Sequence, residues 1–96
     1  MEIRDALESD GPAFVELVQC LAQYEKLVPP DADACARLLR APFANPPQFR
    51  LRLGLNEGRV DAYAAWFLTY STFRARPTLY LEDLFVHPRA RRQGLG

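Results

Sequence analysis

The sequence predicts an α+β domain in which a first strand, two helices and three antiparallel strands follow one another. The apolar residues show a helical spacing within 14–21 and an alternating spacing from Phe49 onward. Prolines and glycines separate these periodic segments. With 96 residues, 49% of them hydrophobic, the chain is long enough for one domain around one modest core.

A short strand is expected at the beginning of residues 1–10, and a helix follows it. Ser9 or Asp10 is suited to cap the first turn of this helix. Pro12 fits the first turn because the N–H group that proline lacks has no helical partner there. Apolar residues then recur at the spacing of one buried helical face: Phe14, Leu17, Val18 and Leu21. The two prolines at 29–30 end the helix before residue 29.

A second, shorter helix is expected through Leu38 and Leu39. Asp31 or Asp33 is a candidate cap for it, since a short carboxylate side chain accepts hydrogen bonds from unpaired amides of a first turn. The stretch 41–48 contains three prolines. That composition predicts a loop.

The second half of the chain predicts three strands. Residues 49–56 alternate apolar and polar side chains, which is typical of a half-buried strand, and 56–58 form a hairpin turn. Residues 60–73 are an apolar run rich in aromatics, which predicts a strand buried on both faces. After a turn at 74–78, a third strand is expected at 79–86, and Pro88 ends it.

The composition excludes several classes of protein. Twelve basic residues balance twelve acidic ones, which argues against a nucleic-acid-binding domain and its basic footprint. Cys20, Cys35 and a single histidine are too few ligands for a zinc site, so no metal is expected. No signal peptide or apolar stretch of about 18 residues is present. We therefore expect a cytoplasmic protein without a membrane partner.

Two glycines close together suggest an anion site at the end of the sequence. Gly94 and Gly96 would let backbone amides approach a ligand, and Arg91 and Arg92 add positive charge. The arrangement suits a pyrophosphate, whereas the alternative is a plain turn with solvated arginines. Because the strand at 79–86 would be left as an apolar edge, we expect the chain to be the front part of a larger domain.

The spacing Arg91-x-x-Gly94-x-Gly96 after an apolar strand resembles the acetyl-CoA loop of the GNAT superfamily of N-acetyltransferases. This resemblance implies that residues 1–96 are a single partial domain, the amino-terminal part of a GNAT fold that stops at the pyrophosphate loop. It implies acetyl-CoA as co-substrate. The residues that would bind it are Leu84, Phe85 and Val86, through free backbone groups, and the loop residues Arg91, Arg92, Gln93, Gly94, Leu95 and Gly96.

Within that superfamily, segments 21–25, 67–71 and 79–86 are similar to the diamine (spermidine/spermine) acetyltransferases. In those enzymes the residues matching Tyr24, Glu25 and Glu82 line the polyamine site, and the resemblance implies a homodimer for the full-length protein. A polyamine is a chain of ammonium groups, which carboxylates and an aromatic face can bind. Glu82 is the candidate base that removes a proton from the attacking amine.

Other interpretations stay open. Glu25 near a helix end also fits a solvated surface residue. Glu82 and Asp83 lie on opposite faces of a strand by alternation, so at most one faces the site unless a bulge intervenes. The acceptor is a polyamine or a different amine such as a lysine analogue; alternatively the chain is a non-catalytic CoA-binding or interaction fragment. The general acid, a tyrosine in such enzymes, is expected beyond residue 96.

Overall fold

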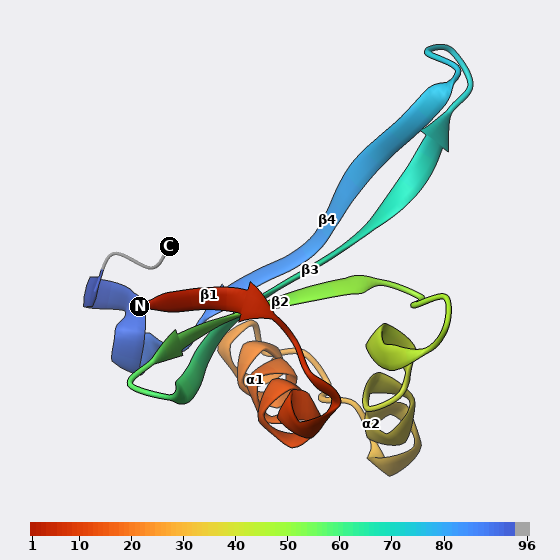
Figure 1. Cartoon of the computed structure of the whole chain (residues 1–96). Coiled ribbons are helices and arrows are strands. Elements are labelled where there is room, and N and C mark those ends of the chain that lie inside the picture. The colour runs from red at the N-terminus through yellow and green to blue at the C-terminus, as the bar shows by residue number, and fades with distance from the viewer. Residues whose placement is uncertain (94–96) are drawn as a thin grey trace.

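The structure, a computed structural model, describes residues 1–93 and confirms the predicted α+β class. Four antiparallel strands form one sheet in the order β1-β2-β3-β4, and both helices lie on one side of it (Figure 1). The strands are β1 (Glu2–Asp5), β2 (Arg50–Asn56), β3 (Arg59–Ser71) and β4 (Arg76–Val86). The helices are α1 (Gly11–Tyr24) and α2 (Ala32–Leu38), with short 3-10 helices η1 (Glu8–Asp10), η2 (Ala41–Phe43) and η3 (Pro88–Gln93).

The helix caps match the sequence at one helix and differ at the other. Asp31 precedes α2, and its carboxylate accepts a hydrogen bond from the Ala34 amide at 2.8 Å, as predicted. Asp10 precedes α1 but does not cap it through its side chain. Its carboxylate instead accepts hydrogen bonds from the Leu7 amide and from Arg4, both at 2.7 Å. The prediction of an Asp10 cap was therefore wrong, because a nearby guanidinium competes for the same oxygens.

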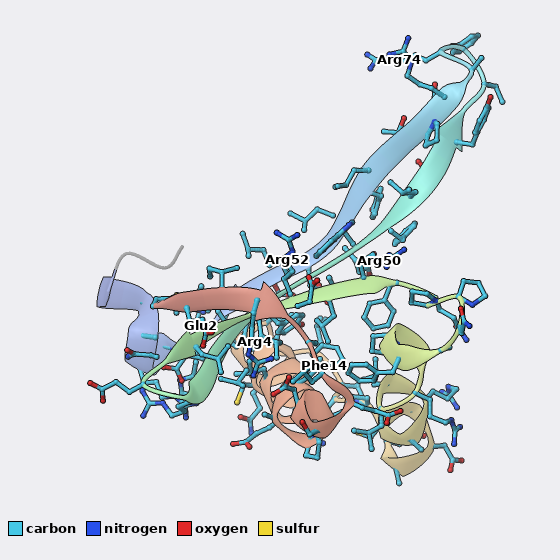
Figure 2. The ribbon with its side chains drawn as sticks, in the orientation of Figure 1. Glu2, Arg4, Phe14, Arg50, Arg52 and Arg74 are labelled. Atoms are coloured by element: carbon cyan, nitrogen blue, oxygen red, sulfur yellow. The ribbon has the colours of Figure 1, made fainter. Side chains whose placement is uncertain are left out.

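The core lies between α1 and the sheet. Phe14 and Leu17 of α1 point at the sheet and are almost fully buried, and Figure 2 shows Phe14 in this position. The Phe14 ring meets the Tyr63 ring edge to face, with centroids 5.1 Å apart. The remaining buried members of the cluster come from three strands: Leu51, Leu53, Leu55, Ala65 and Phe85. Burial of each large apolar side chain contributes roughly 1.5–3 kcal/mol to folding.

The outer halves of β3 and β4 leave the rest of the sheet and project as a long two-stranded arm (Figure 1). Leu68 and Tyr70 of β3 are about two-thirds exposed, so the prediction of a strand buried on both faces holds only for its first half. The predicted turn at 74–78 is also wrong, since β4 already begins at Arg76. Pro77 fits there because β4 has no partner on its other side among the described strands.

The two long strands, β3 and β4, each contain one extra residue that interrupts the pairing with the preceding strand. Gly54 pairs with Ala62 and Leu55 with Val60, so Asp61 of β3 has no partner on β2. Ala65 pairs with Asp83 and Trp66 with Leu81, so Glu82 of β4 has no partner on β3. Such β-bulges bend a strand and redirect its side chains. Both extra residues are carboxylates.

The chain leaves α1 through a left-handed residue. The Leu27 amide donates to the carbonyl of Ala22 and the Lys26 amide to that of Gln23, a Schellman motif in which Lys26 has φ 58°. Most helices place glycine at this position, because a side chain there is strained by roughly 1–2 kcal/mol. Lys26 therefore strains the turn that follows Tyr24 and Glu25.

We predict that Lys26→Gly raises the free energy of unfolding by about 0.5–1 kcal/mol, since relief of the strain exceeds the entropic cost of glycine. Lys26→Ala is the matched control, because it removes the same charge and keeps the strained Cβ. Urea denaturation of both variants measures the difference. Equal stability of the glycine and alanine variants would contradict the assignment of strain to this residue.

Candidate active site

The bulge at Glu82 places two neighbouring carboxylates in one pocket. Without it, Glu82 and Asp83 would face opposite sides of β4. With it, both line a hollow of about 370 Å³ on the face of the sheet that carries the helices. Glu82 is exposed and Asp83 half-buried, so a ligand can approach both. The sequence predicted that Glu82 and Asp83 face one site only if a bulge intervenes, and the structure has that bulge.

The rest of this carboxylate pocket is mainly apolar. Its walls come from α1, the end of α2, the segment before β2, and β3: Phe14, Val18, Leu38, Gln48, Phe49, Ala65 and Phe67. A pocket with two carboxylates beside aliphatic and aromatic walls suits a cationic group on a flexible aliphatic chain. The Gln48 carboxamide adds a neutral polar group to it.

Asp83 is held from beneath by a core tyrosine. The Tyr63 hydroxyl donates a hydrogen bond to Asp83 Oδ2 at 3.2 Å, while its ring is 1% exposed between Phe14 and Phe85. Burial raises the pKa of Tyr63 far above its ordinary value, and the negative charges of Asp83, Glu25 and Glu82 raise it further. Three carboxylates thus act on one phenol.

The other two predicted acceptor residues, Glu25 and Tyr24, lie at the end of α1. Glu25 is exposed and close enough to Tyr63 for its charge to affect that phenol. Tyr24 does not line the carboxylate pocket. Its ring lies under the Arg91 guanidinium, 4.3 Å from the ring centroid, at a separate hollow that it shares with Phe85. The structure therefore brings together Glu82, Asp83 and Tyr63, and puts Tyr24 beside Arg91 and Phe85, for which the sequence predicts cofactor contacts.

The free edge of β4 presents backbone groups next to this hollow. The His87 amide donates to the Asp61 carbonyl, which identifies that pair as hydrogen-bonded. Because hydrogen-bonded and non-bonded pairs alternate in an antiparallel ladder, the backbone groups of Leu84 and Val86 point to the free edge and those of Phe85 point to β3. Two of the three predicted cofactor-binding positions thus direct their backbone groups to the free edge, where the Val86 carbonyl already accepts a hydrogen bond from Arg91.

Arg91 lies at this edge as well. Its Nε donates to the Val86 carbonyl at 2.8 Å, and its guanidinium also lies 5.5 Å from the Phe85 ring centroid. Arg92 and Gln93 belong to η3. Gly94, Leu95 and Gly96, which carry the predicted loop, lie outside the described residues.

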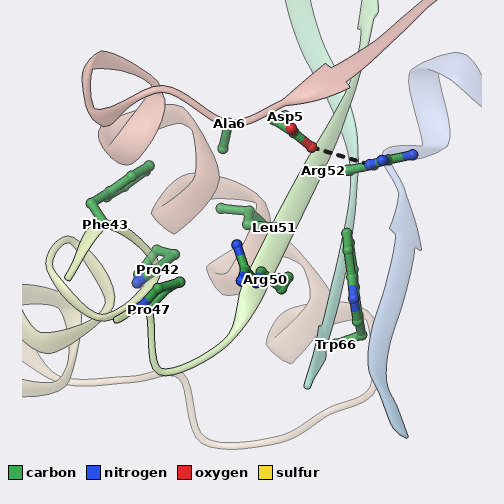
Figure 3. A pocket seen from close by; sticks show the side chains of 9 residues that line it. All are labelled: Asp5, Ala6, Pro42, Phe43, Pro47, Arg50, Leu51, Arg52 and Trp66. Carbon is green, nitrogen blue, oxygen red and sulfur yellow. Dashed lines mark hydrogen bonds and ion pairs between the residues drawn. The ribbon is translucent and has the colours of Figure 1, made fainter. Parts of the chain in front are cut away.

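A third hollow of about 330 Å³, the arginine hollow, lies by Arg50 and Arg52 (Figure 3). Arg52 donates to the Asp5 carboxylate at 3.1 Å and lies 5.8 Å from the Trp66 ring centroid. Two guanidinium groups repel a cation, so the arginine hollow does not suit an ammonium acceptor. Charge therefore distinguishes the two hollows and favours the carboxylate pocket.

Sequence reasoning predicted no site role for Tyr63, which lies in a run expected only as a buried strand. It left Asp83 undecided, since strand alternation puts it opposite Glu82 unless a bulge intervenes. A hydrophobic pattern does not reveal which buried tyrosine has a carboxylate within reach, whereas two adjacent acids in an apolar strand were a usable signal.

Within residues 1–93, no helix is long and apolar enough to cross a membrane, and no cluster of side chains is arranged to hold a metal ion.

The raised pKa of Tyr63 predicts a pH dependence of stability. Above about pH 10 the unfolded chain releases this proton and the folded protein keeps it, so the free energy of unfolding falls by about 1.4 kcal/mol per pH unit through this group. Tyr63→Phe should lower stability by about 1 kcal/mol at neutral pH, through the lost hydrogen bond, and remove that alkaline slope. Urea unfolding across pH 7–11 measures both effects; parallel alkaline slopes would contradict the prediction.

Comparisons with known proteins identify the family of the chain. The family described as Acetyltransferase (GNAT) matches residues 12–96. Thialysine N-epsilon-acetyltransferases of Bos taurus and Mus musculus are each 34% identical to the chain over 103 residues. These alignments cover 98% of this chain and 59% of each relative, so the chain spans about three-fifths of their length.

Solved structures show the same fold. A possible acetyltransferase from Clostridium difficile 630 superposes with a TM-score of 0.83 at 20% identity, covering 97% of this chain and 61% of its own. An integron cassette protein from the mobile metagenome of Cole Harbour Salt Marsh gives a TM-score of 0.86 at 28% identity, covering 98% and 61%. The family match, the relatives and the shared fold together show that the chain belongs to the GNAT family of acetyltransferases.

Proposed function

We propose that the intact protein transfers an acetyl group from acetyl-CoA to the primary amine at the end of a flexible aliphatic molecule. The observation that carries this proposal is the bulge at Glu82, which puts two carboxylates into one pocket with apolar walls. An ammonium group needs the carboxylates, and the methylene chain behind it needs the apolar walls. Family membership supplies the reaction class.

Two acceptor classes fit the carboxylate pocket. A lysine analogue is supported by the relatives, which are named as thialysine acetyltransferases. A polyamine is supported by the resemblance of the strand segments to the diamine enzymes and by the additional charge of Glu25 near Tyr63. A polyamine carries only positive charges, whereas a lysine analogue also carries a carboxylate. A comparison of kcat/KM between a polyamine and a lysine analogue therefore distinguishes the two acceptor classes.

The residues at the edge of β4 fit acetyl-CoA. The backbone groups of Leu84 and the Val86 amide point to the free edge, where they can pair with amide groups of an extended ligand. The Arg91 guanidinium provides positive charge at the end of that edge, where η3 leads toward the predicted loop at 94–96. When bound, acetyl-CoA supplies the acetyl group as an activated thioester.

Glu82 is the proposed base. Its exposed carboxylate is able to accept a proton from the acceptor ammonium, directly or through water, which leaves a neutral amine nitrogen as the nucleophile. Asp83, fixed by the Tyr63 hydroxyl, holds the positive charge of the incoming amine and orients it. The amine nitrogen would then attack the thioester carbonyl directly, without an acyl-enzyme intermediate. The C–N bond forms, the C–S bond breaks, and the CoA thiolate leaves and takes up a proton as the nitrogen loses one, so that free thiol is released. From the resemblance we also expect a cytoplasmic homodimer for the full-length protein.

We predict that Glu82→Gln lowers kcat by about 10²-fold or more for every primary amine, because general-base catalysis contributes that amount. Glu57→Gln is the matched control, since Glu57 is an exposed acid in the turn between β2 and β3 and lines none of these hollows. Thiol release from acetyl-CoA is followed with thialysine, spermidine and a simple monoamine as acceptors.

The same assay tests the acceptor class. A higher kcat/KM for thialysine than for spermidine supports the lysine analogue, and the reverse order supports the polyamine. Parental turnover in Glu82→Gln would show that this carboxylate is not the base. Absence of acetyl transfer from the parent to any of the three amines would refute the proposed function.

A further inference from the structure

A carboxylate is buried within β3, at the point where η3 packs against the strand. Asp61 is 0% exposed, although its side chain is charged and the residues around it in the sequence are mainly apolar. It is the extra residue of the bulge opposite β2, which turns it out of the regular ladder. A buried carboxylate needs charged partners to offset its desolvation.

Two arginines provide those partners from different parts of the chain. Arg59, on the same strand, donates to both carboxylate oxygens of Asp61, at 2.8 and 3.0 Å. Arg89, on η3, donates through its Nε to Asp61 Oδ1 at 2.5 Å. Burial opposes ionisation, but these hydrogen bonds hold the pKa of Asp61 below its ordinary value, so it is charged at neutral pH. Of these two arginines, only Arg89 lies on η3.

Further contacts lock the beginning of η3 to β3. The Arg89 guanidinium also donates to the Val60 carbonyl at 3.1 Å. The His87 amide donates to the Asp61 carbonyl at 2.7 Å, and the Arg89 amide donates to His87 Nδ1 at 3.1 Å. One strand residue thus holds η3 through both its side chain and its backbone.

The next residues along η3 depend on this attachment. Ala90 is fully buried against Ala62 and Val86. Arg91 follows directly and reaches the free edge of β4, where it meets the Val86 carbonyl and the Tyr24 ring. Because Arg89, Ala90 and Arg91 are consecutive, a shift of Arg89 moves Arg91 relative to the edge.

We propose that Asp61, acting through Arg89, is a positioning residue for acetyl-CoA, which fixes the path of η3 and hence the place of Arg91 at the edge of β4. This inference rests on the proposed function, since that function places the cofactor along Leu84, Val86 and Arg91. Asp61 itself does not touch the ligand in this scheme. Its carboxylate anchors the segment that does.

The matched pair Arg89→Met and Arg59→Met tests the inference. Each variant removes one guanidinium from Asp61 and leaves the other, so the buried charge keeps a partner, but only Arg89→Met releases η3. We expect Arg89→Met to raise the Kd and KM for acetyl-CoA about tenfold, or about 1.4 kcal/mol. The kcat and the acceptor KM should change less than about twofold, and Arg59→Met should leave cofactor binding at the parental value.

Hydrogen exchange supplies a readout that needs no cofactor. The Ala90 amide donates to the His87 carbonyl at 2.9 Å. Its exchange should accelerate about tenfold in Arg89→Met and remain parental in Arg59→Met. Asp61→Asn, which keeps both arginines, should weaken acetyl-CoA binding as Arg89→Met does. Calorimetry on the intact protein measures the affinities.

Several results would overturn the inference. Equal weakening in Arg59→Met and Arg89→Met would indicate a general loss of stability or charge instead of positioning. Weakening in Arg89→Met with parental affinity in Asp61→Asn would indicate that Arg89 contacts the ligand directly. Parental affinity in Arg89→Met would refute the inference alone. A parent protein that does not bind acetyl-CoA would refute the proposed function, and the inference with it.

Discussion

The extra residue in β4 at Glu82 is the constraint on which the rest of the arrangement depends. Strand side chains alternate with a period of two, so one inserted residue reverses the facing of everything beyond it. After the extra residue, Asp83 and Phe85 face α1. Before it, Leu81 pairs with Trp66 on the opposite face of the sheet, and the Tyr80 ring packs against Phe67. The insertion therefore forms the carboxylate pocket and also sets which faces the arm presents.

Tyr63 joins this pocket to the core. Its ring packs on Phe14 with centroids 5.1 Å apart, and its hydroxyl reaches Asp83. Tyrosine suits this position because it combines a large apolar surface with one polar end. The hydrogen bond to Tyr63 therefore links the position of Asp83 to the packing between α1 and the sheet. The other carboxylate, Glu82, has more freedom, as its exposure indicates.

The two bulges place carboxylates in opposite electrostatic situations. Asp61 is fully buried and ion-paired with Arg59 and Arg89, since a buried charge without partners would be strongly destabilising. Among the side chains that the structure describes, the ion pairs include Asp61 but neither Glu82 nor Asp83. The first bulge therefore serves as an attachment point for η3, and the second leaves negative charge accessible to a cation.

The sequence by itself determined the order of the elements, the Asp31 cap and the turn at 56–58, because each depends on neighbouring residues. It also carried the resemblance to the GNAT superfamily, which the family match confirmed. It also singled out Glu82. Only the tertiary structure decided that Asp83 shares its pocket, that Tyr24 lies under Arg91, and that Asp61 is bound by two arginines. These features depend on the register between strands. Register is set by which distant segments pair and by where one strand has an extra residue, and local periodicity carries no record of either.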